Sequence, residues 1–443
     1  MKFWRFKKKW IEAVLAFAMT AVLAGCAWQG TAISEEGGLL TKTQVEEDRK
    51  QAIQYVEDVH PFFELEEDQS EYKEAKKAYI SQTQSGMTVW EFWGATAEYM
   101  SSLRDAHTRI QDPGGIKVLD IPASYENGKS YLWENGKRTG LYVEKVGGVD
   151  VEKIYEKIDK MIVAENAAAE EQNREKYLAV NTILKFCGAV SKNDQVEVEF
   201  SDGTKRIYSF MEVGRSTEEV TNNCFTEGDI FVVDFNTCEV DQKLEEIAVK
   251  LEEAVENGCT KVIIDVRGNP GGDSNACLRI LEAMGMREPY YGSVIRFSKE
   301  AKEQGGVPID HGIIETKGST LMAKANEDVQ LIVLSDHITF SSATMLCVWV
   351  RDGKLGKIVG EPSTNKPNSY GDILMFQLEN SGLVMSVSYK KFTRPDSSNN
   401  EDMLVPDVQT SSEDAYDKAV ELLNRQQAET TCTSSPVRLL YYI

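Results

Sequence analysis

The sequence predicts an α/β fold in which helices cover a buried β-sheet, preceded by a helical segment and a β-rich segment. Strands and helices alternate from Gly228 onward, and the apolar runs at 261–266 and 330–334 are typical of strands buried on both faces. The chain has 443 residues, of which 42% are hydrophobic and 27% charged, so it is long enough for a large core.

Residues 41–114 are expected to form a helical subdomain. Thr43 and Glu46 have the spacing of a capping box, and apolar residues follow at helical intervals. A charged helix comes next, and a third helix opens at Thr88. His107 lies just past the predicted end of that third helix.

Residues 115–222 are expected to form a small β-rich module. Three Asn-Gly or Asp-Gly turn signals, at 127–128, 135–136 and 202–203, flank short alternating segments. An Ala- and Glu-rich helical stretch at 164–186 separates these segments.

The third region, residues 223–425, alternates strands with helices. Strands are expected at 230–235, 261–266, 330–334 and 357–359, helices at 242–256, 275–284 and 342–352, and two antiparallel strands at 373–378 and 383–389. Ligand sites in such sheets lie at the carboxyl ends of the strands, which is where chemistry is expected.

The composition excludes several classes of function. Lys and Arg number 49 against 71 Asp and Glu, and the resulting net charge of −22 argues against nucleic acid as a partner. Neither Cys-x-x-Cys nor His-x-x-x-His spacing occurs, so no metal site is expected, and no organic cofactor is expected either.

The N-terminus has the pattern of an export signal. Basic residues precede an apolar run at 11–23, which is too short to span a bilayer. The run ends in Leu-Ala-Gly-Cys, which resembles a bacterial lipobox and implies lipidation of Cys26. We therefore expect a signal peptide at 1–25, a tether at 26–40, and a bacterial cell-envelope protein held outside the cytoplasm by its lipid anchor. The alternatives are a signal end with a chance cysteine or a buried N-terminal helix.

Cysteine pairing cannot be assigned from the sequence. Seven cysteines besides Cys26 form an odd set: Cys187, Cys224, Cys238, Cys259, Cys277, Cys347 and Cys432. Several lie in apolar stretches, where a free cysteine behaves as a small hydrophobic residue.

A glycine-rich turn at 265–273 follows a buried strand and opens a helix. Three glycines and a proline can present backbone N–H groups beside the helix N-terminus, as an oxyanion hole requires. A nucleotide-binding loop is less suitable because no Gly-x-Gly-x-x-Gly or Gly-Lys-Ser/Thr pattern is present. A purely structural turn is the alternative.

A hydroxyl-rich segment at 335–344 follows the next buried strand. Ser341 and Ser342 stand just before a predicted helix, where the helix dipole favours developing negative charge. Either serine could instead simply cap the helix, and local sequence alone favours capping.

Together these segments resemble a known family. VIIDVRGNPGGD at 262–273, LIVLSDHITFSSAT at 331–344 and IVGEP at 358–362 are similar to three landmarks of the tail-specific, or C-terminal processing, peptidases. Asp-Ala-His-Thr at 105–108 is similar to a landmark of the tricorn-type branch. The resemblance covers roughly residues 45–425 and implies a crotonase-like core and a serine-type peptidase acting on protein or peptide substrates.

The resemblance also implies roles for single residues. Ser341 falls on the nucleophile position, Ser342 supplies one oxyanion N–H, and Gly271 or Gly272 supplies the other. The family commonly has a glutamate where this chain has Thr344, a supporting position whose change does not remove the nucleophile.

Two general bases are compatible with the family. One branch uses a lysine 25 residues after the nucleophile, which is Lys366 here, and the other uses the histidine that matches His107. In that second solution a glutamate orients the histidine, and Glu401 is the candidate. A lysine base needs burial to lower a reference pKa of about 10.4, whereas histidine is already near 6.5, so His107 is preferred. His60 and His337 are expected to be structural.

The remaining expectations concern substrate binding. The module at 115–222 lies where these peptidases carry a PDZ domain, and a PDZ-like module could bind a substrate's extended C-terminus by strand addition. Residues 426–443 are expected to be a tail outside the catalytic core. The alternative function is a non-catalytic relative that binds peptides or apolar ligands on the same core.

Overall fold

The computed structural model describes residues 38–114, 116–212 and 220–433, which form two compact units. The first unit contains the described residues up to 212, Tyr291–Ser319 and Thr364–Met403, and the second contains Val220–Tyr290, Thr320–Ser363 and the residues from Leu404 on. The predicted catalytic range 223–425 is thus divided between the units. The predicted signal peptide, including Cys26, lies outside the described residues.

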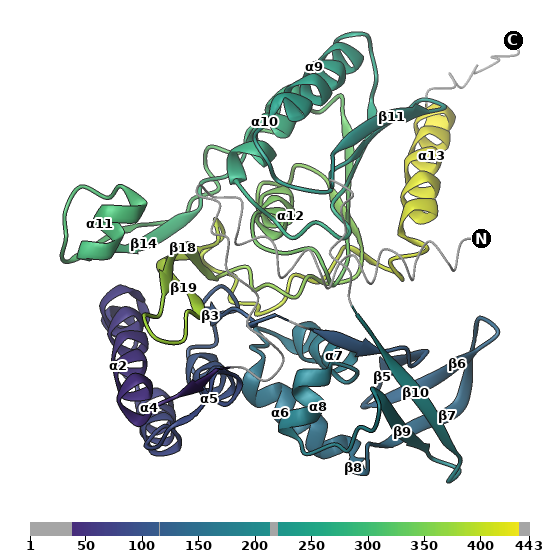
Figure 1. Ribbon diagram of the computed structural model, residues 1–443. Helices are drawn as coiled ribbons and strands as arrows, with labels where there is room; N and C mark the ends of the chain where they lie inside the picture. Colours follow the sequence, from purple (N-terminus) through teal and green to yellow (C-terminus); the bar gives the residue numbers. More distant parts are fainter. Residues whose placement is uncertain (1–37, 115, 213–219, 434–443) are drawn as a thin grey trace, which may run out of the picture. The chain divides into compact units, whose positions relative to one another are not determined.

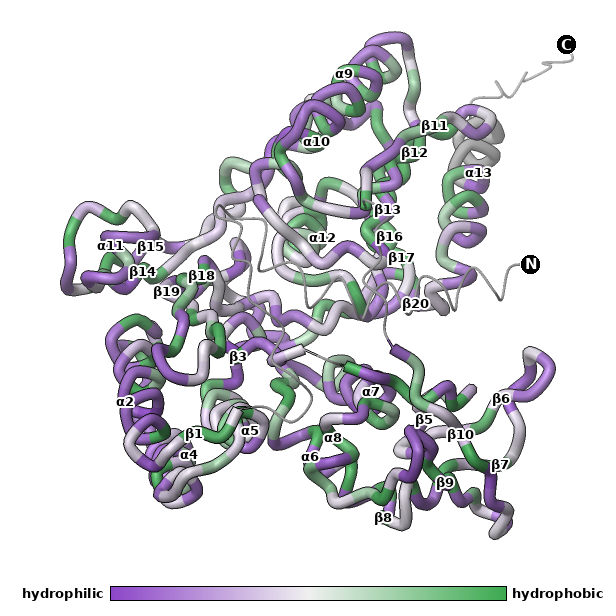
Figure 2. The backbone as a smooth tube through the Cα atoms, viewed as in Figure 1, coloured by the Kyte–Doolittle hydropathy of each residue, from purple (hydrophilic) through white to green (hydrophobic). Residues whose placement is uncertain are grey.

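The second unit is built on a mostly parallel six-stranded sheet. Its order is β11 (Asn223–Glu227), β12 (Ile230–Asp234), β13 (Lys261–Asp265), β16 (Gln330–Ser335), β17 (Lys357–Gly360) and β20 (Val408–Gln409). Only the β11–β12 pair is antiparallel. The central strands are the apolar runs of the sequence and are largely green in Figure 2.

Helices cover both faces of this sheet, as predicted. The helices are α9 (Gln242–Glu256), α10 (Ser274–Ala283), α12 (Ser342–Asp352) and α13 (Ala415–Thr433). Alternate strand residues such as Ile263 and Ile332 pack on Ala415, Ala419 and Leu423 of α13, while α9, α10 and α12 lie against the other face (Figure 1).

The first unit begins with a helical layer. Its helices are α2 (Lys42–Val59), α3 (Phe62–Leu65), α4 (Ser70–Gln82) and α5 (Val89–Ser101), and a two-stranded ribbon joins β1 (Leu39–Leu40) to β2 (Met87–Thr88). The helix start predicted at Thr88 is confirmed, and Thr88 and Glu91 form a capping box there. The one at Thr43 was wrong, because Thr41 and Gln44 form the reciprocal bonds and Thr43 lies inside α2.

An antiparallel sheet supports the segment that carries His107. Its order is β15 (Ile313–Thr316), β14 (Gly292–Arg296), β19 (Val384–Thr393) and β18 (Tyr370–Gln377), with β3 (Arg109–Ile110) also paired to β19 and α11 (Lys299–Gly305) beside β18. The predicted pair at 373–378 and 383–389 therefore belongs to this sheet. Because β3 starts two residues after His107, the sheet fixes the end of the His107 segment.

The β-rich module predicted at 115–222 is present in the same unit. Its sheet runs β4 (Lys117–Leu119), β10 (Lys205–Glu212), β9 (Gln195–Phe200), β7 (Lys137–Val146), β6 (Lys129–Glu134) and β5 (Ala123–Glu126), with β8 (Val149–Asp150) paired to β7. Helices α6 (Val151–Met161), α7 (Ala167–Tyr177) and α8 (Asn181–Phe186) accompany it. The predicted helical stretch 164–186 is thus two helices.

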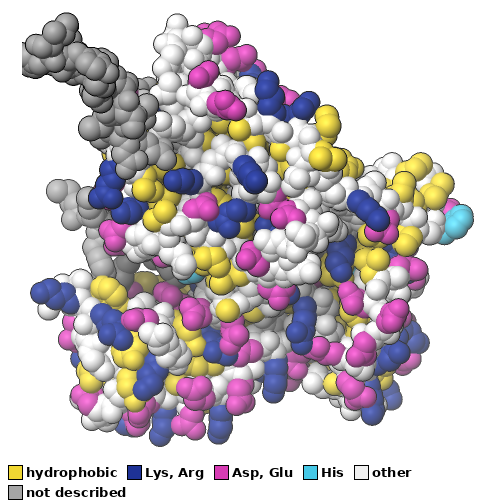
Figure 3. All heavy atoms as spheres, turned by 180° about the vertical axis from the view of Figure 1, so that it is seen from behind, with side chains coloured by type: hydrophobic (Ala, Val, Ile, Leu, Met, Phe, Trp, Pro, Cys, Tyr) yellow, Lys and Arg dark blue, Asp and Glu magenta, His cyan; other side chains and the backbone are white. Residues whose placement is uncertain are grey.

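The surface shown in Figure 3 carries acidic and basic side chains interspersed with one another. The net charge is therefore not gathered into one patch on that face. Within the described part of the chain, no helix is both long and apolar enough to cross a membrane.

Candidate active site

Ser341 has an unusual backbone conformation. Its φ is 52° and its ψ is −123°, a region that non-glycine residues rarely occupy and that costs of order 1–3 kcal/mol. Ser341 precedes α12, yet its side chain makes no capping hydrogen bond to that helix. Helix capping therefore does not explain this serine. Strain of this kind is typical of residues held in position for chemistry.

The glycine-rich turn packs directly against Ser341. A Cβ atom added to Gly271, whose φ is +98°, would lie 2.6 Å from the Ser341 Cβ and 3.0 Å from the Ser342 nitrogen. A Cβ atom on Gly272 would lie 2.5 Å from the Cys238 carbonyl oxygen. Glycine is therefore required at both positions, and the turn brings its backbone beside the first N–H of α12.

Ser342 ties the two segments together. Its hydroxyl donates to the Gly272 carbonyl oxygen at 2.6 Å, while its backbone N–H belongs to the first turn of α12, where N–H groups have no intrahelical acceptor. The Gly271 N–H donates to Asn269 Oδ1 at 2.8 Å. An oxyanion donor is consequently better supplied by the Gly272 N–H than by that of Gly271.

Two residues that we did not predict hold this arrangement in place. Asn269 is fully buried. Its side-chain Nδ2 donates to the Phe235 carbonyl oxygen at 2.7 Å, and its backbone carbonyl oxygen accepts the Phe340 N–H at 3.0 Å. Asp336 Oδ1 accepts the N–H groups of Gly268 at 3.0 Å and Thr339 at 3.0 Å. One carboxylate thus joins the glycine turn to the nucleophile segment.

His337 has a supporting place in the second unit, in line with the structural role that we predicted. Its Nδ1 lies 2.9 Å from the Pro362 carbonyl oxygen, and its Nε2 lies 3.7 Å from Glu361 Oε2. The imidazole thereby connects the nucleophile segment to the Glu-Pro of the third landmark.

His107 lies in the first unit, beside a buried carboxylate. Its backbone N–H donates to Asp105 Oδ1 at 2.9 Å, and its Nδ1 lies 3.6 Å from the same oxygen. Asp105 has no exposed surface. Burial alone would raise the pKa of Asp105, but hydrogen bonds with His107 and His60 outweigh burial and hold that pKa below its ordinary value.

His60, predicted to be structural, takes part in this network. The Phe62 N–H donates to His60 Nδ1 at 3.1 Å, so the ring proton lies on Nε2, which donates to Asp105 Oδ2 at 3.1 Å. Ser388 of β19 adds a second donor to that oxygen at 2.6 Å. Asp105 is consequently fixed from three sides, with one oxygen turned toward His107.

Glu165 is a second buried carboxylate near His107, and the sequence reading did not single it out. One of its oxygens accepts the Ala106 N–H at 2.9 Å, and the other accepts the Lys366 N–H at 2.9 Å and the Asn365 Nδ2 at 2.6 Å. Burial raises the pKa of Glu165, while the charge of His107 and the backbone donors oppose that rise.

Lys366 and Glu401 lie in other surroundings of the first unit. The Lys366 ammonium is 3.2 Å from Asp402, whose side chain is 75% exposed, and only the backbone of Lys366 contacts Glu165. Glu401 is 57% exposed, accepts from Asn399 at 3.1 Å, and lies 3.8 Å from Arg394. A general base must be neutral, whereas the lysine ion pair uses the charged ammonium.

Asp105, His107 and Glu165 form the one group of potential metal ligands found among the described residues. One ligand atom from each lies within 4.8 Å of the others. The carboxylates already accept backbone and side-chain hydrogen bonds, so the group also has the form of a hydrogen-bonded acid–base cluster.

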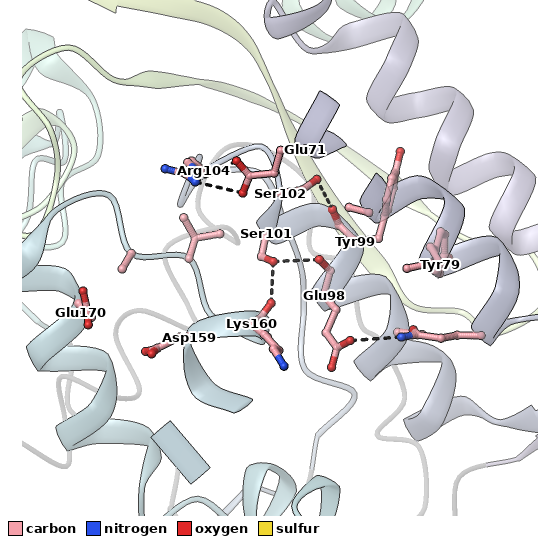
Figure 4. A pocket seen from close by; sticks show the side chains of 16 residues that line it. Glu71, Tyr79, Glu98, Tyr99, Ser101, Ser102, Arg104, Asp159, Lys160 and Glu170 are labelled. Atoms are coloured by element: carbon pink, nitrogen blue, oxygen red, sulfur yellow. Dashed lines mark hydrogen bonds and ion pairs between the residues drawn. The ribbon is translucent and has the colours of Figure 1, made fainter. Parts of the chain in front are cut away.

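A separate pocket of about 480 Å³ opens between α4, α5 and the α6–α7 connection of the first unit (Figure 4). Its polar lining includes Glu71, Glu98, Arg104 and Lys160, and Tyr79 and Tyr99 contribute aromatic surface. No residue predicted to be catalytic lines it.

Comparison with known proteins points to one family. Residues 227–410 match the model of peptidase family S41, the family that the motifs resemble. The fold is similar to mature CPAF, with a TM-score of 0.58 at 13% identity over 90% of this chain and 100% of that chain. The structure of mature CPAF complexed with lactacystin has a TM-score of 0.58 at 13% identity, over 88% of this chain and 99% of that chain. The photosystem II D1 C-terminal processing protease has a TM-score of 0.42 at 15% identity, over 84% of this chain and 94% of that chain. No curated protein sequence matches the chain.

Proposed function

We propose that this chain is a serine-type peptidase of family S41 that hydrolyses peptide bonds through an acyl-enzyme on Ser341. The observation that carries the proposal is the backbone of Ser341, held at φ 52° between the glycine turn and the N-terminus of α12. A serine whose only task were to cap a helix would not need that conformation.

In the proposed reaction, Ser341 Oγ attacks the substrate carbonyl carbon as a base removes its proton. The negative charge on the carbonyl oxygen is stabilised by the N–H groups of Ser342 and Gly272, assisted by the α12 dipole. Removing one such donor typically costs about a hundredfold or more in rate. Collapse of the intermediate breaks the C–N bond, and water then releases the acyl group.

His107 is the base in this proposal, and its proton goes to the leaving amine. Nδ1 of His107 faces Asp105, which leaves Nε2 for the serine proton. We assign Asp105 and Glu165 to orient the imidazole and balance its charge, in place of Glu401. Lys366 remains the alternative base; the ion pair with Asp402 counts against it.

The proposal includes an extracytoplasmic place for the enzyme. We expect a lipid anchor on Cys26 in the bacterial cell envelope, on the strength of the lipobox-like sequence alone. Intact-mass measurement of the membrane fraction should find a mature chain that begins at Cys26 and carries added lipid mass. A species that still contains Met1 would contradict this expectation.

We propose that the β-rich module holds a peptide substrate. Strands β4 and β5 are the edges of the module's sheet, and an open edge can accept an extended peptide by strand addition.

A fluorophosphonate probe tests the catalytic proposal against the non-catalytic alternative. The purified protein should form a covalent adduct, and peptide mapping should place it on Ser341. A binding protein on the same core would retain peptide affinity without any adduct. Adduct formation on Ser342 or elsewhere would remove the assignment of the nucleophile.

A further inference from the structure

Two buried cysteines of the second unit lie side by side. Cys238 follows β12, and Cys277 lies in the first turn of α10, 39 residues later. Their Sγ atoms are 3.6 Å apart, and neither residue has exposed surface. The sequence left the pairing of these cysteines open.

Cys238 is bound to the glycine turn through its backbone. Its N–H donates to the Gly271 carbonyl oxygen at 3.0 Å, and its carbonyl oxygen accepts the Asp273 N–H at 2.7 Å. A Cβ atom added to Gly272 would lie only 2.5 Å from the same carbonyl oxygen, so the two segments are in close contact. Movement of Cys238 therefore moves the turn that supplies the proposed oxyanion donor.

Cys277 is bound to the other half of the nucleophile site. Its thiol lies 3.4 Å from the Ser342 carbonyl oxygen, to which it can donate, and α10 packs beside α12 (Figure 1). The two thiols thus connect the glycine turn with the helix that starts at the nucleophile.

We propose that Cys238 and Cys277 are an oxidation site whose disulfide displaces the glycine turn and slows acylation of Ser341. In the reaction, an oxidant of the disulfide class gives up its S–S bond. One cysteine sulfur forms a mixed disulfide and releases one thiol, and the second cysteine sulfur then displaces the other. Two thiols and one small disulfide become one protein disulfide and two small thiols.

The geometry sets the expected effect. Bond formation brings the two sulfurs from 3.6 Å to about 2 Å, and it removes the hydrogen that Cys277 can donate to Ser342. Misplacing catalytic groups by about 1 Å can cost on the order of a hundredfold in rate. The effect on acylation rests on the proposed function, whereas formation of the disulfide does not.

Oxidation is expected to be slow. The hydrogen bond with Cys238 and burial raise the pKa of Cys277, and exchange requires the thiolate. Cys347 of α12 is a third buried thiol in this unit, and burial raises its pKa to about 12. Cys347 is therefore the competing partner, and partly exposed Cys259 is a suitable control.

The test incubates the full chain with oxidised glutathione for hours and then blocks the remaining thiols. Peptide mapping without reductant should show Cys238 joined to Cys277 in a chain two hydrogens lighter. Hydrogen exchange over residues 268–273 should differ from that of the reduced protein. Fluorophosphonate labelling should slow by at least about tenfold and recover with dithiothreitol. Cys238→Ala should abolish the response, and Cys259→Ser should retain it.

Several results would overturn the proposal. They are the absence of a cross-link, a cross-link through Cys347, and a Cys238–Cys277 cross-link that changes neither exchange nor labelling. If even the reduced protein is never labelled, the proposed peptidase function fails. The peptide map and the exchange over 268–273 then still decide whether the disulfide forms and displaces the turn.

Discussion

The Ser341 segment of the second unit and the His107 segment of the first unit are held in place by different means. In the second unit the arrangement around Ser341 is formed mainly by the backbone. The glycine turn, the strained backbone of Ser341 and the N-terminus of α12 all lie within two short segments. In the first unit, side chains from distant segments converge. Asp105, for example, is bound by the side chains of His60 and Ser388, which lie 45 and 283 residues away from it in the sequence. The residues that form the Ser341 arrangement are therefore close together in the sequence, whereas the residues that hold Asp105 are distributed along the chain.

The largest effect is expected in the Ser341 segment. Ser341→Ala should lower peptide hydrolysis by at least about a thousandfold, because only oxyanion stabilisation and binding remain without the nucleophile. Ser342→Ala keeps its backbone N–H and loses only the hydroxyl bond to Gly272, so its loss should be about tenfold or less. The measurement is kcat/KM on a peptide substrate, with circular dichroism as the control for folding. Equal losses in the two variants would contradict the assignment.

The next effect separates the two bases. His107→Ala should lower kcat by on the order of a hundredfold or more and abolish fluorophosphonate labelling. Lys366→Ala should retain most activity, since its backbone N–H, which bonds Glu165, is unchanged. The reverse result would assign the base to Lys366 and leave the first unit's carboxylates with a structural role.

A smaller effect compares two glutamates. Glu165→Gln should lower kcat by about tenfold with little change in KM, because the buried carboxylate beside His107 loses its charge. Glu401→Gln should change neither by more than about twofold, since its carboxylate is exposed and next to Arg394. A larger loss in Glu401→Gln would restore the acid that the sequence suggested.

The contrast between the units also explains what the sequence could predict. The buried strands β13 and β16 are uninterrupted apolar runs, and the serine and glycine motifs at their ends stay together in the fold. Glu165 has no such local signal, because its donors Ala106 and Asn365 are 59 and 200 residues away. Asp336 and Asn269 were within reach, since each stands inside a motif, where Asp and Asn side chains commonly accept turn N–H groups.

Sheet membership was harder to predict than strand position. Strands β18 and β19 lie where expected and pair with each other, but β19 also pairs with β14 and with β3, two strands that were not expected from the sequence. Antiparallel pairing between distant segments depends on tertiary packing and leaves little trace in local periodicity. The range 223–425 therefore read as one region, although its residues belong to two units.

The last expected effect is on stability instead of rate and tests the Asp105 network directly. Asp105→Asn leaves His60 and Ser388 facing an amide, and loss of a buried hydrogen-bonded carboxylate should cost about 3 kcal/mol at pH 7. The pKa of Asp105 is below its ordinary value in the folded state. Its stabilisation should therefore be complete above the unfolded-state pKa of about 3.9 and should decline as pH falls below that value.

Urea unfolding, followed by tryptophan fluorescence from pH 7 down to pH 3, measures this difference between wild type and variant. The free-energy gap should stay constant down to about pH 4 and then shrink. Asp310→Asn is the matched control, because Asp310 also pairs with a histidine, at 2.8 Å from His311, but in an exposed position. No measurable change is expected there. If the wild type and Asp105→Asn have the same free energy of unfolding at pH 7, the buried carboxylate does not hold the His107 segment in place.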